Sequence, residues 1–338
     1  MDYNLLWFVL VGALFAGYAI LDGFDLGVGA LMLGVKDDEH RRVFYNAIGP
    51  VWDGNEVWLV TGGGALFAAF PAVYATVFSG FYMAFMLLLF ALIFRAVAIE
   101  FRSKEPWVWW RRSWDGCFFA SSTLAALLIG VAMGNIVWGI PLDARGEFAG
   151  SFLGLLGPYP LLMGVTTVAL FMMHGSIYLH MKTEGPVQQR VRGWINPLII
   201  AFIVCYAVTT MATLLYVPRM TDVLRAQPVL FLVVVALVLA IANIPREIHR
   251  GHDGFAFLSS CATMLLLMSL FGLGMFPHMV YSTPDPAHSL TAYNAASTTK
   301  TLRIMTLIAA IGVPIVLGYT ASVYYIFRGK VRLGKDSY

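Results

Sequence analysis

The chain has 338 residues, of which 59% are hydrophobic and 12% are charged, and its net charge is +3. Soluble globular domains are about 45–50% apolar and about 25% charged, so this composition excludes a soluble fold and also a disordered chain. The small net charge gives no indication of a nucleic-acid partner. Three widely separated cysteines in apolar runs indicate neither a disulfide framework nor an iron–sulfur site. We therefore predict an all-α integral membrane protein.

Uncharged stretches of roughly 20 residues or more predict the membrane spans. Residues 5–33, which are apolar apart from Asp22 and Asp25, form the first span. We expect this span to be retained rather than cleaved as a signal peptide. Residues 57–94 are too long for one helix, and Pro71 divides them into two spans joined as a tight hairpin. Six further stretches bring the predicted total to nine: 116–142, 148–181, 193–218, 226–245, 254–284 and 304–327.

The distribution of Lys and Arg between alternate sides of nine spans predicts the orientation. One side carries only Arg145, Arg219, Arg225, Lys300 and Arg303, Arg95 lies within a span, and the rest of the 22 lie on the other side. This bias places the N-terminus outside and the C-terminus in the cytoplasm.

The segments between spans are short, so the sequence predicts no soluble catalytic domain. Residues 36–49 are predicted to form a short interfacial helix on the cytoplasmic side, whereas residues 135–156 and 282–300 are predicted to be external loops.

Ionisable residues within or at the ends of the spans are the main functional candidates, because charge at membrane depth is costly. They occur at spacings that place pairs on one helix face, and all belong to the predicted cytoplasmic half. They are Asp22, Asp25, Asp53, Glu56, Arg95, Glu100 and Asp115. The pattern predicts a proton-uptake path that rises from the cytoplasm.

Structural roles remain open for each of these residues. Asp53 and Glu56 have the spacing of a helix capping box. Asp22 and Asp25 could simply pair with the buried cation Arg95. Glu100 and Asp115 could lie at the water interface. The glycines of the first span, including Gly27, indicate close helix packing.

Three histidines are candidate haem ligands by residue type. His174 and His180 lie six residues apart on one predicted helix and face different directions, and His278 belongs to the opposite membrane half. We expect them to be hydrogen-bonded packing residues and expect no haem in this chain. No metal site is predicted.

Four ordered motifs resemble one family closely: residues 23–29 (GFDLGVG), 50–59 (PVWDGNEVWL), 62–71 (GGGALFAAFP) and 101–104 (FRSK). The chain resembles subunit II of the cytochrome bd quinol oxidases, and the similarity extends over essentially the whole chain. The resemblance implies nine transmembrane helices arranged as two four-helix bundles plus one peripheral helix. The bundles would be residues 1–140 and 141–283. Residues 284–338 would contain an external loop, the ninth helix and a cytoplasmic tail.

The resemblance also implies the reaction and the partners. In the family, subunit I holds two b haems and one d haem, oxidises quinol and reduces O2 to water. Subunit II contains no haem and has no catalytic centre of its own; it contributes a scaffold, a proton route and, in some members, a structural quinone. The expected partners are subunit I, membrane lipid and quinone, with a small single-span accessory subunit as a further candidate. The expected location is a bacterial or archaeal plasma membrane.

Motif positions carry the family's proton-route residues onto this chain. These are Asp25, Asp53, Arg95 and Glu100, with Trp52 as the motif neighbour of Asp53. Glu56 is glutamine in some members, which implies a tuning role. Ala96 stands where the family often has proline, so the helix near Arg95 is expected to differ there.

Two other classes of protein were compared with the oxidase subunit. A proton-coupled secondary transporter would also contain many apolar spans and intramembrane carboxylates. No pair of broken helices marks a substrate site at the membrane centre, and all the acids belong to one half. A haem-bearing membrane anchor is disfavoured by the positions of the histidines.

Overall fold

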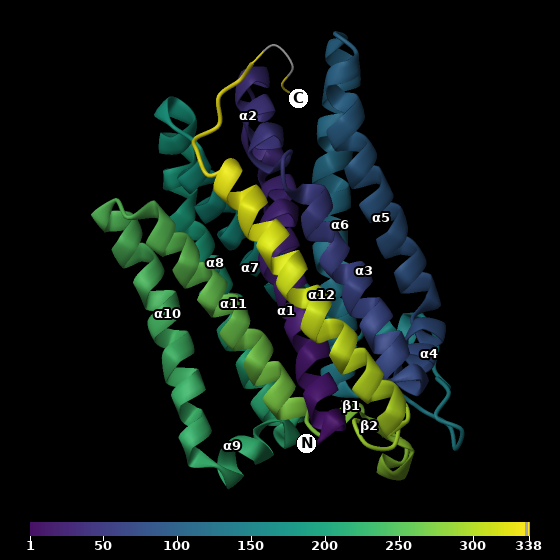
Figure 1. The fold of residues 1–338 in the computed structure, drawn as a ribbon. Coiled ribbons are helices and arrows are strands. Elements are labelled where there is room, and N and C mark those ends of the chain that lie inside the picture. The colour runs from purple at the N-terminus through teal and green to yellow at the C-terminus, as the bar shows by residue number, and fades with distance from the viewer. Residues whose placement is uncertain (335–336, 338) are drawn as a thin grey trace.

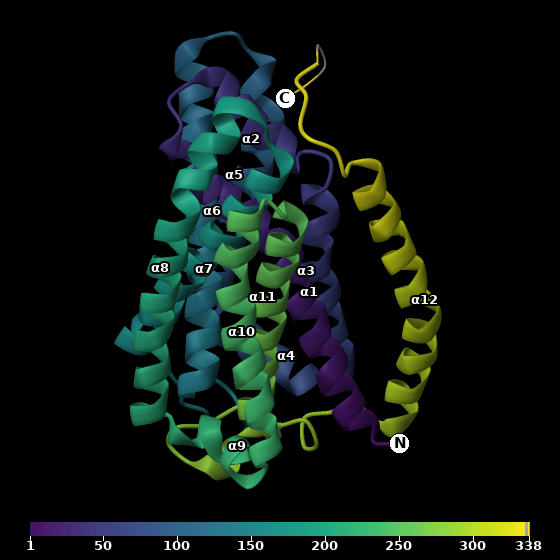
Figure 2. The same ribbon diagram turned by 90° about the vertical axis from the view of Figure 1, so that its left-hand side faces the viewer.

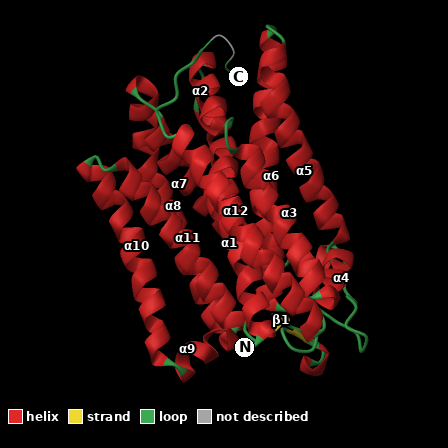
Figure 3. Cartoon of the chain, viewed as in Figure 1, coloured by secondary structure: helices red, strands yellow, loops and turns green. Residues whose placement is uncertain are grey.

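The computed structural model describes residues 1–334 and 337, and it is almost entirely helical (Figures 1 and 3). Residues 335–336 and 338 of the predicted cytoplasmic tail lie outside the described residues. Eight helices are long and apolar enough to cross a membrane. They are α1 (Tyr3–Leu31), α5 (Tyr82–Phe101), α6 (Val108–Trp138), α7 (Pro158–Lys182), α8 (Gly185–Tyr216), α10 (Phe231–Arg250), α11 (Asp253–Met275) and α12 (Thr299–Ile326).

Shorter elements connect these helices. They are α2 (Asp38–Ile48), α3 (Trp52–Ala69), α4 (Pro71–Gly80) and α9 (Asp222–Ala226), six short 3-10 helices (Met32–Gly34, Arg102–Lys104, Leu153–Leu156, Pro218–Thr221, Pro228–Leu230 and Pro286–His288), and the strands β1 (His278–Val280) and β2 (Leu290–Thr291). The two strands pair in antiparallel register, with His278 opposite Thr291.

The predicted second span corresponds to α3, which is 18 residues long but not apolar enough to qualify by composition. Asp53, Asn55 and Glu56 lie in its first turns and lower its mean hydropathy. Nine spans are therefore not reproduced by length and composition alone. Pro71 does end α3, because proline cannot continue the hydrogen-bond ladder. It also begins the separate helix α4, so a short helix replaces the predicted tight hairpin.

The predicted interfacial segment 36–49 contains the helix α2. The Asp37 carboxylate accepts hydrogen bonds from the backbone N–H groups of Glu39 and His40, at 2.9 and 3.3 Å, and so caps the helix. Its last turns bury Phe44, Tyr45 and Ile48. The predicted helix is confirmed and is amphipathic, whereas its place at the membrane interface stays a prediction.

Helix α1 lies at the centre of the packing and contacts α3, α6, α7, α11 and α12. Helices α5 and α6 pack together, α7 packs against both α6 and α8, and α10 packs against α11. Figure 2 shows α12 standing apart from the other helices along one side of the molecule. The C-terminus and α2 lie at one end, and the N-terminus and the β1–β2 hairpin lie at the other (Figure 1).

Glycines allow α1 and α7 to approach until their backbones touch. A Cβ atom added to Gly27 would lie 1.8 Å from the carbonyl oxygen of Phe171, and one added to Gly175 would lie 2.7 Å from the carbonyl carbon of Gly27. Small residues at such crossings are the usual means of close helix packing in membranes. The packing role predicted for Gly27 is confirmed. The crossing lies next to Asp25 in sequence, so it helps to place the acidic part of α1.

We expect Gly27→Ala to destabilise the protein, because the methyl group has no room at the α1–α7 crossing. Overpacking typically costs about 1–3 kcal/mol, and the midpoint of thermal unfolding in detergent should fall. Gly12→Ala is the matched control on the same helix, since nothing lies within 4 Å of the added Cβ there. Equal unfolding temperatures for the two variants would contradict the close crossing.

Candidate functional site

A buried ion cluster joins three helices through Arg95. Arg95 lies on α5 and is 1% exposed; its Nη1 lies 2.7 Å from Oδ1 of Asp22 on α1. Its Nη2 lies 3.5 Å from Oε2 of Glu56 on α3. Asp22 is fully buried, and Glu56 is partly buried. The structural alternative, in which Asp22 and Asp25 pair with Arg95, therefore holds for Asp22.

Asp25, one turn further along α1, is fully buried but takes a different partner. Its Oδ2 accepts a hydrogen bond of 2.8 Å from Nδ2 of Asn55 on α3. Oδ1 of Asn55 accepts a hydrogen bond of 2.9 Å from the hydroxyl of Tyr324 on α12. Oδ1 of Asp25 is buried and has no hydrogen-bond partner among the described residues.

The charges of this cluster do not balance. Asp22, Asp25 and Glu56 provide three carboxylates around the single guanidinium of Arg95, so full ionisation would leave an excess of negative charge. Isolating charge from water costs several kcal/mol per ion unless it is paired. Binding protons would remove that excess. The arrangement can therefore hold and release protons at a site shielded from solvent.

The other predicted residues lie around this cluster rather than in it. Asp53 is exposed at the start of α3, one turn before Glu56. Trp52 is buried and packs with Ile48 and Val51. Glu100 is partly buried near the end of α5.

The capping alternative for Asp53 and Glu56 is wrong. Helix α3 begins after Val51, and no side chain caps it. Asp53 therefore lies inside the first turn, and Glu56 turns toward Arg95 instead.

Asn55 and Tyr324 also belong to the site, although neither was among the predicted residues. Asn55 carries no charge, but its position between Asp53 and Glu56 was a usable signal. Tyr324 lies 269 residues from Asn55 along the chain, and nothing in its local sequence marks it.

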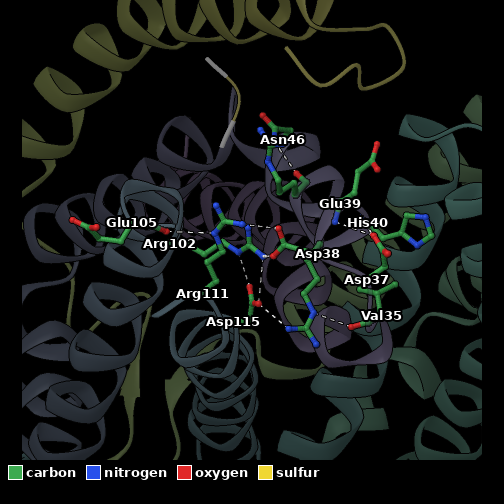
Figure 4. Close-up of polar contacts among 12 residues, drawn as sticks. Val35, Asp37, Asp38, Glu39, His40, Asn46, Arg102, Glu105, Arg111 and Asp115 are labelled. Carbon is green, nitrogen blue, oxygen red and sulfur yellow. Dashed lines mark hydrogen bonds and ion pairs between the residues drawn. The ribbon is translucent and has the colours of Figure 1, made fainter. Parts of the chain in front are cut away.

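A second ion network, shown in Figure 4, fixes α2 to the connection between α5 and α6. Nε of Arg102 donates to Oδ1 of Asp115 at 2.9 Å, and both residues are 1% exposed. Arg41 reaches the other oxygen of Asp115 at 2.8 Å. Asp38 accepts from Arg102 at 2.6 Å and from Arg111 at 3.0 Å. Three arginines here face two aspartates, so both carboxylates are fully compensated.

The network also encloses Tyr45 of α2. The guanidinium of Arg102 lies 5.5 Å from the centre of its ring. Burial, together with the neighbouring carboxylate of Asp115, raises the pKa of Tyr45 well above its ordinary value. Asp115 is thus buried inside the protein, and the alternative that places it at a water interface is wrong.

His174 and His180 make polar contacts within the protein, whereas the ring of His278 packs edge-on against Tyr281. The two ring nitrogens of His174 are hydrogen-bonded to the Ser260 hydroxyl at 2.8 Å and to the carbonyl of Ile20 at 2.9 Å. His180 lies 3.3 Å from Asp253. His174 is a hydrogen-bonded packing residue, as predicted. Within residues 1–334 and 337, no group of three or more His, Cys, Asp or Glu side chains could hold a metal ion.

Comparison with known proteins identifies the family. Residues 3–327 match the sequence profile of cytochrome bd terminal oxidase subunit II. The chain belongs to this family. It is 36% identical to the cytochrome bd-I ubiquinol oxidase subunit 2 of Escherichia coli K12, over 98% of this chain and 96% of that protein. It is 35% identical to the cytochrome bd ubiquinol oxidase subunit 2 of Bacillus subtilis 168, over 96% of each.

The fold of this subunit II chain is similar to one found in a solved structure. A chain in the structure of bd oxidase from Geobacillus thermodenitrificans matches with a TM-score of 0.78, covering 97% of this chain and 98% of that one, at 14% identity. At this identity the similarity concerns the fold. Together with the eight membrane-length helices, the subunit II relatives show a multi-pass protein of the bacterial inner membrane.

We expect Arg102→Met to destabilise this subunit, because it removes one of the two arginines that contact the buried carboxylate of Asp115. Breaking a buried pair costs about 3–5 kcal/mol, and we expect the lower end because Arg41 still contacts Asp115. Thermal unfolding in detergent measures the effect. Arg112→Met, which replaces an exposed arginine of the same segment, is the control. If both variants unfold at the same temperature, the network does not stabilise the protein.

Proposed function

We propose that this chain is the haem-free subunit II of a quinol oxidase that reduces O2 to water, and that it conducts protons from the cytoplasm. Membership of the subunit II family and the two ubiquinol oxidase relatives support the oxidase role. The observation that carries the proton role is the excess of buried carboxylates around Arg95. These comparisons favour an oxidase subunit over a secondary transporter.

The proposed topology has nine passes: the eight membrane-length helices and α3, which would be the second pass in chain order. Helix α12 ends on the side of the molecule that carries α2, opposite the N-terminus, and this supports an odd number of passes (Figure 1). Eight membrane-length helices alone would return the C-terminus to the N-terminal side. The end that carries α2 and the C-terminus also carries most of the basic residues, so we place it in the cytoplasm.

The proposed bundles are those that the family resemblance implies. Helices α1, α3, α5 and α6, within residues 1–140, would form the first bundle, and α7, α8, α10 and α11, within residues 141–283, would form the second. In support, α1 packs against α3 and α6, and α7 packs against α8 and α11. Contacts of α7 with α1 and α6 join them. Helix α12, within residues 284–338, is the peripheral helix and contacts α1 and α3.

The proposed proton route begins at Asp53, which is exposed near the cytoplasmic end of α3. Glu56 lies one helical turn deeper and contacts Arg95. Arg95 contacts Asp22, and Asp25 lies one turn from Asp22 on the same helix. The carboxylates would pass protons inward, while Arg95 limits the negative charge that the cluster carries. Glu100, also on α5, is proposed as a supporting acid.

The haems are assigned to the partner subunit I, which is proposed to hold two b haems and one d haem. Hydrogen bonds to both ring nitrogens of His174 support this assignment, since the ring is already occupied by Ser260 and Ile20. A structural quinone and a small single-span accessory subunit stay predictions from the family resemblance.

We expect Asp53→Asn and Asp25→Asn to slow quinol-dependent oxygen uptake of the purified complex by about tenfold or more, because each removes a group that exchanges protons. The haem spectrum should be unchanged, since the ligands belong to the partner. Asp222→Asn, at the opposite end of the molecule, is the matched control. Bleached haem bands in an intact complex, or unchanged turnover across neutral pH, would count against the proposal.

A further inference from the structure

We propose that Asn55 and Tyr324 are positioning residues that hold one oxygen of Asp25, so that the other oxygen, Oδ1, takes up and releases the proton. This inference rests on the proposed proton role of Asp25. It assigns a function to α12, which lies at the edge of the molecule (Figure 2).

The orientation of the Asn55 amide follows from its neighbours. Its Nδ2 lies 2.8 Å from Oδ2 of Asp25 and 3.2 Å from the carbonyl oxygen of Leu21. Both neighbours are acceptors, so the amide nitrogen must face them. The amide oxygen then faces Tyr324, whose hydroxyl must donate at 2.9 Å. The carbonyl of Leu21 thus fixes the direction of the chain of hydrogen bonds, and the Tyr324 hydroxyl holds the amide by donating to its oxygen.

This chain of bonds makes the two oxygens of Asp25 unequal. Oδ2 accepts from Asn55, whereas Oδ1 is buried without a hydrogen-bond partner among the described residues. A proton on Oδ2 would compete with the Asn55 donor, so the acidic proton belongs on Oδ1. An amide has no hydrogen that it can pass on while remaining an amide. Asn55 therefore orients the carboxyl group and does not conduct the proton.

A simpler explanation would be that the hydrogen bond from Tyr324 only anchors α12 to the rest of the protein. Helix α12 has independent anchors at both ends. Near its start, the Trp7 indole donates to the carbonyl of Leu302 and the hydroxyl of Thr306, each at 3.0 Å. Beyond its end, the Lys182 ammonium donates to the carbonyls of Phe327 and Gly329. Loss of the Tyr324 hydroxyl should therefore leave α12 in place.

Several titratable groups surround Asp25 and Tyr324, and each contributes to any pH dependence measured there. They come from α1, α3, α5, α7 and α11, and they are Asp22, Glu56, Arg95, Tyr178 and Cys261.

The experiment compares Tyr324→Phe with Tyr325→Phe in the intact oxidase complex. Tyr325 is the adjacent tyrosine, is 66% exposed, and stacks with Arg328. Infrared difference spectra between two pH values identify the Asp25 carboxyl band as the one missing from Asp25→Asn. The second readout is the pH profile of quinol-dependent oxygen uptake, and haem content checks assembly.

We expect Tyr324→Phe to shift the Asp25 band, displace the pH profile and slow turnover by about two- to tenfold, the range for one hydrogen bond. Tyr325→Phe should match the wild type in all three. Asn55→Ser, whose side chain is too short to bridge the two residues, should shift the same band even if Tyr324→Phe assembles poorly. A normal band and pH profile in both Tyr324→Phe and Asn55→Ser would overturn the inference.

Failure of the underlying proton role gives a different result. In that case the Asp25→Asn variant would retain normal turnover, or its infrared difference spectrum would contain every carboxyl band of the wild type. A slow Asp25→Asn variant together with a fully normal Tyr324→Phe variant would remove only the positioning role.

Discussion

The central constraint on this protein is a single guanidinium, that of Arg95, buried among more carboxylates than it can neutralise. Asp22 and Glu56 contact it from two other helices, and Asp25 lies one turn away. Because Asp22, Asp25 and Arg95 are buried, the helices that carry these groups determine their positions. The close crossing of α1 and α7 at Gly27, and the contact of α3 with α1, are therefore also requirements of the acidic site.

The two buried ion networks, one around Asp115 and one around Arg95, differ in their charge balance. Around Asp115, three arginines face two carboxylates, so the cations outnumber the carboxylates. Around Arg95, three carboxylates share one guanidinium, so the carboxylates outnumber the cation. The Asp115 network holds α2 against the α5–α6 connection, at the end where Asp53 is exposed. The Arg95 cluster joins α1, α3 and α5 instead.

Much of this arrangement could be predicted from the sequence, because charge is rare in apolar spans and therefore informative. Asp22, Glu56 and Arg95 were recognisable in this way, and the structure brings them together. The spacing of charged residues gave a wrong prediction where the exact start of a helix mattered. Asp53 and Glu56 have capping spacing, but α3 begins after Val51 and the spacing has no capping role.

The parts of the site that were not predicted depend on tertiary contacts, which the local sequence does not indicate. Tyr324 reaches Asn55 only because α12 returns beside α3 at the end of the chain. Arg102 follows the α5 helix in a basic segment typical of a solvent-exposed loop, yet Asp115 and Asp38 bury it. Helix α4 was not predicted, because Pro71 marks the end of one helix and equally the start of the next.

The most direct test of the proton role is side-specific proton uptake by the complex in sealed vesicles. The complex is reconstituted in one orientation, with a pH-sensitive dye on the side that carries α2 and the C-terminus, and oxygen is added to the fully reduced enzyme. We expect protons to be consumed on that side in step with oxygen reduction, and uptake to be slowed together with oxygen reduction in Asp25→Asn. Uptake from the opposite side, or uptake on that side at an unchanged rate in the variant, would contradict a route through the Arg95 cluster.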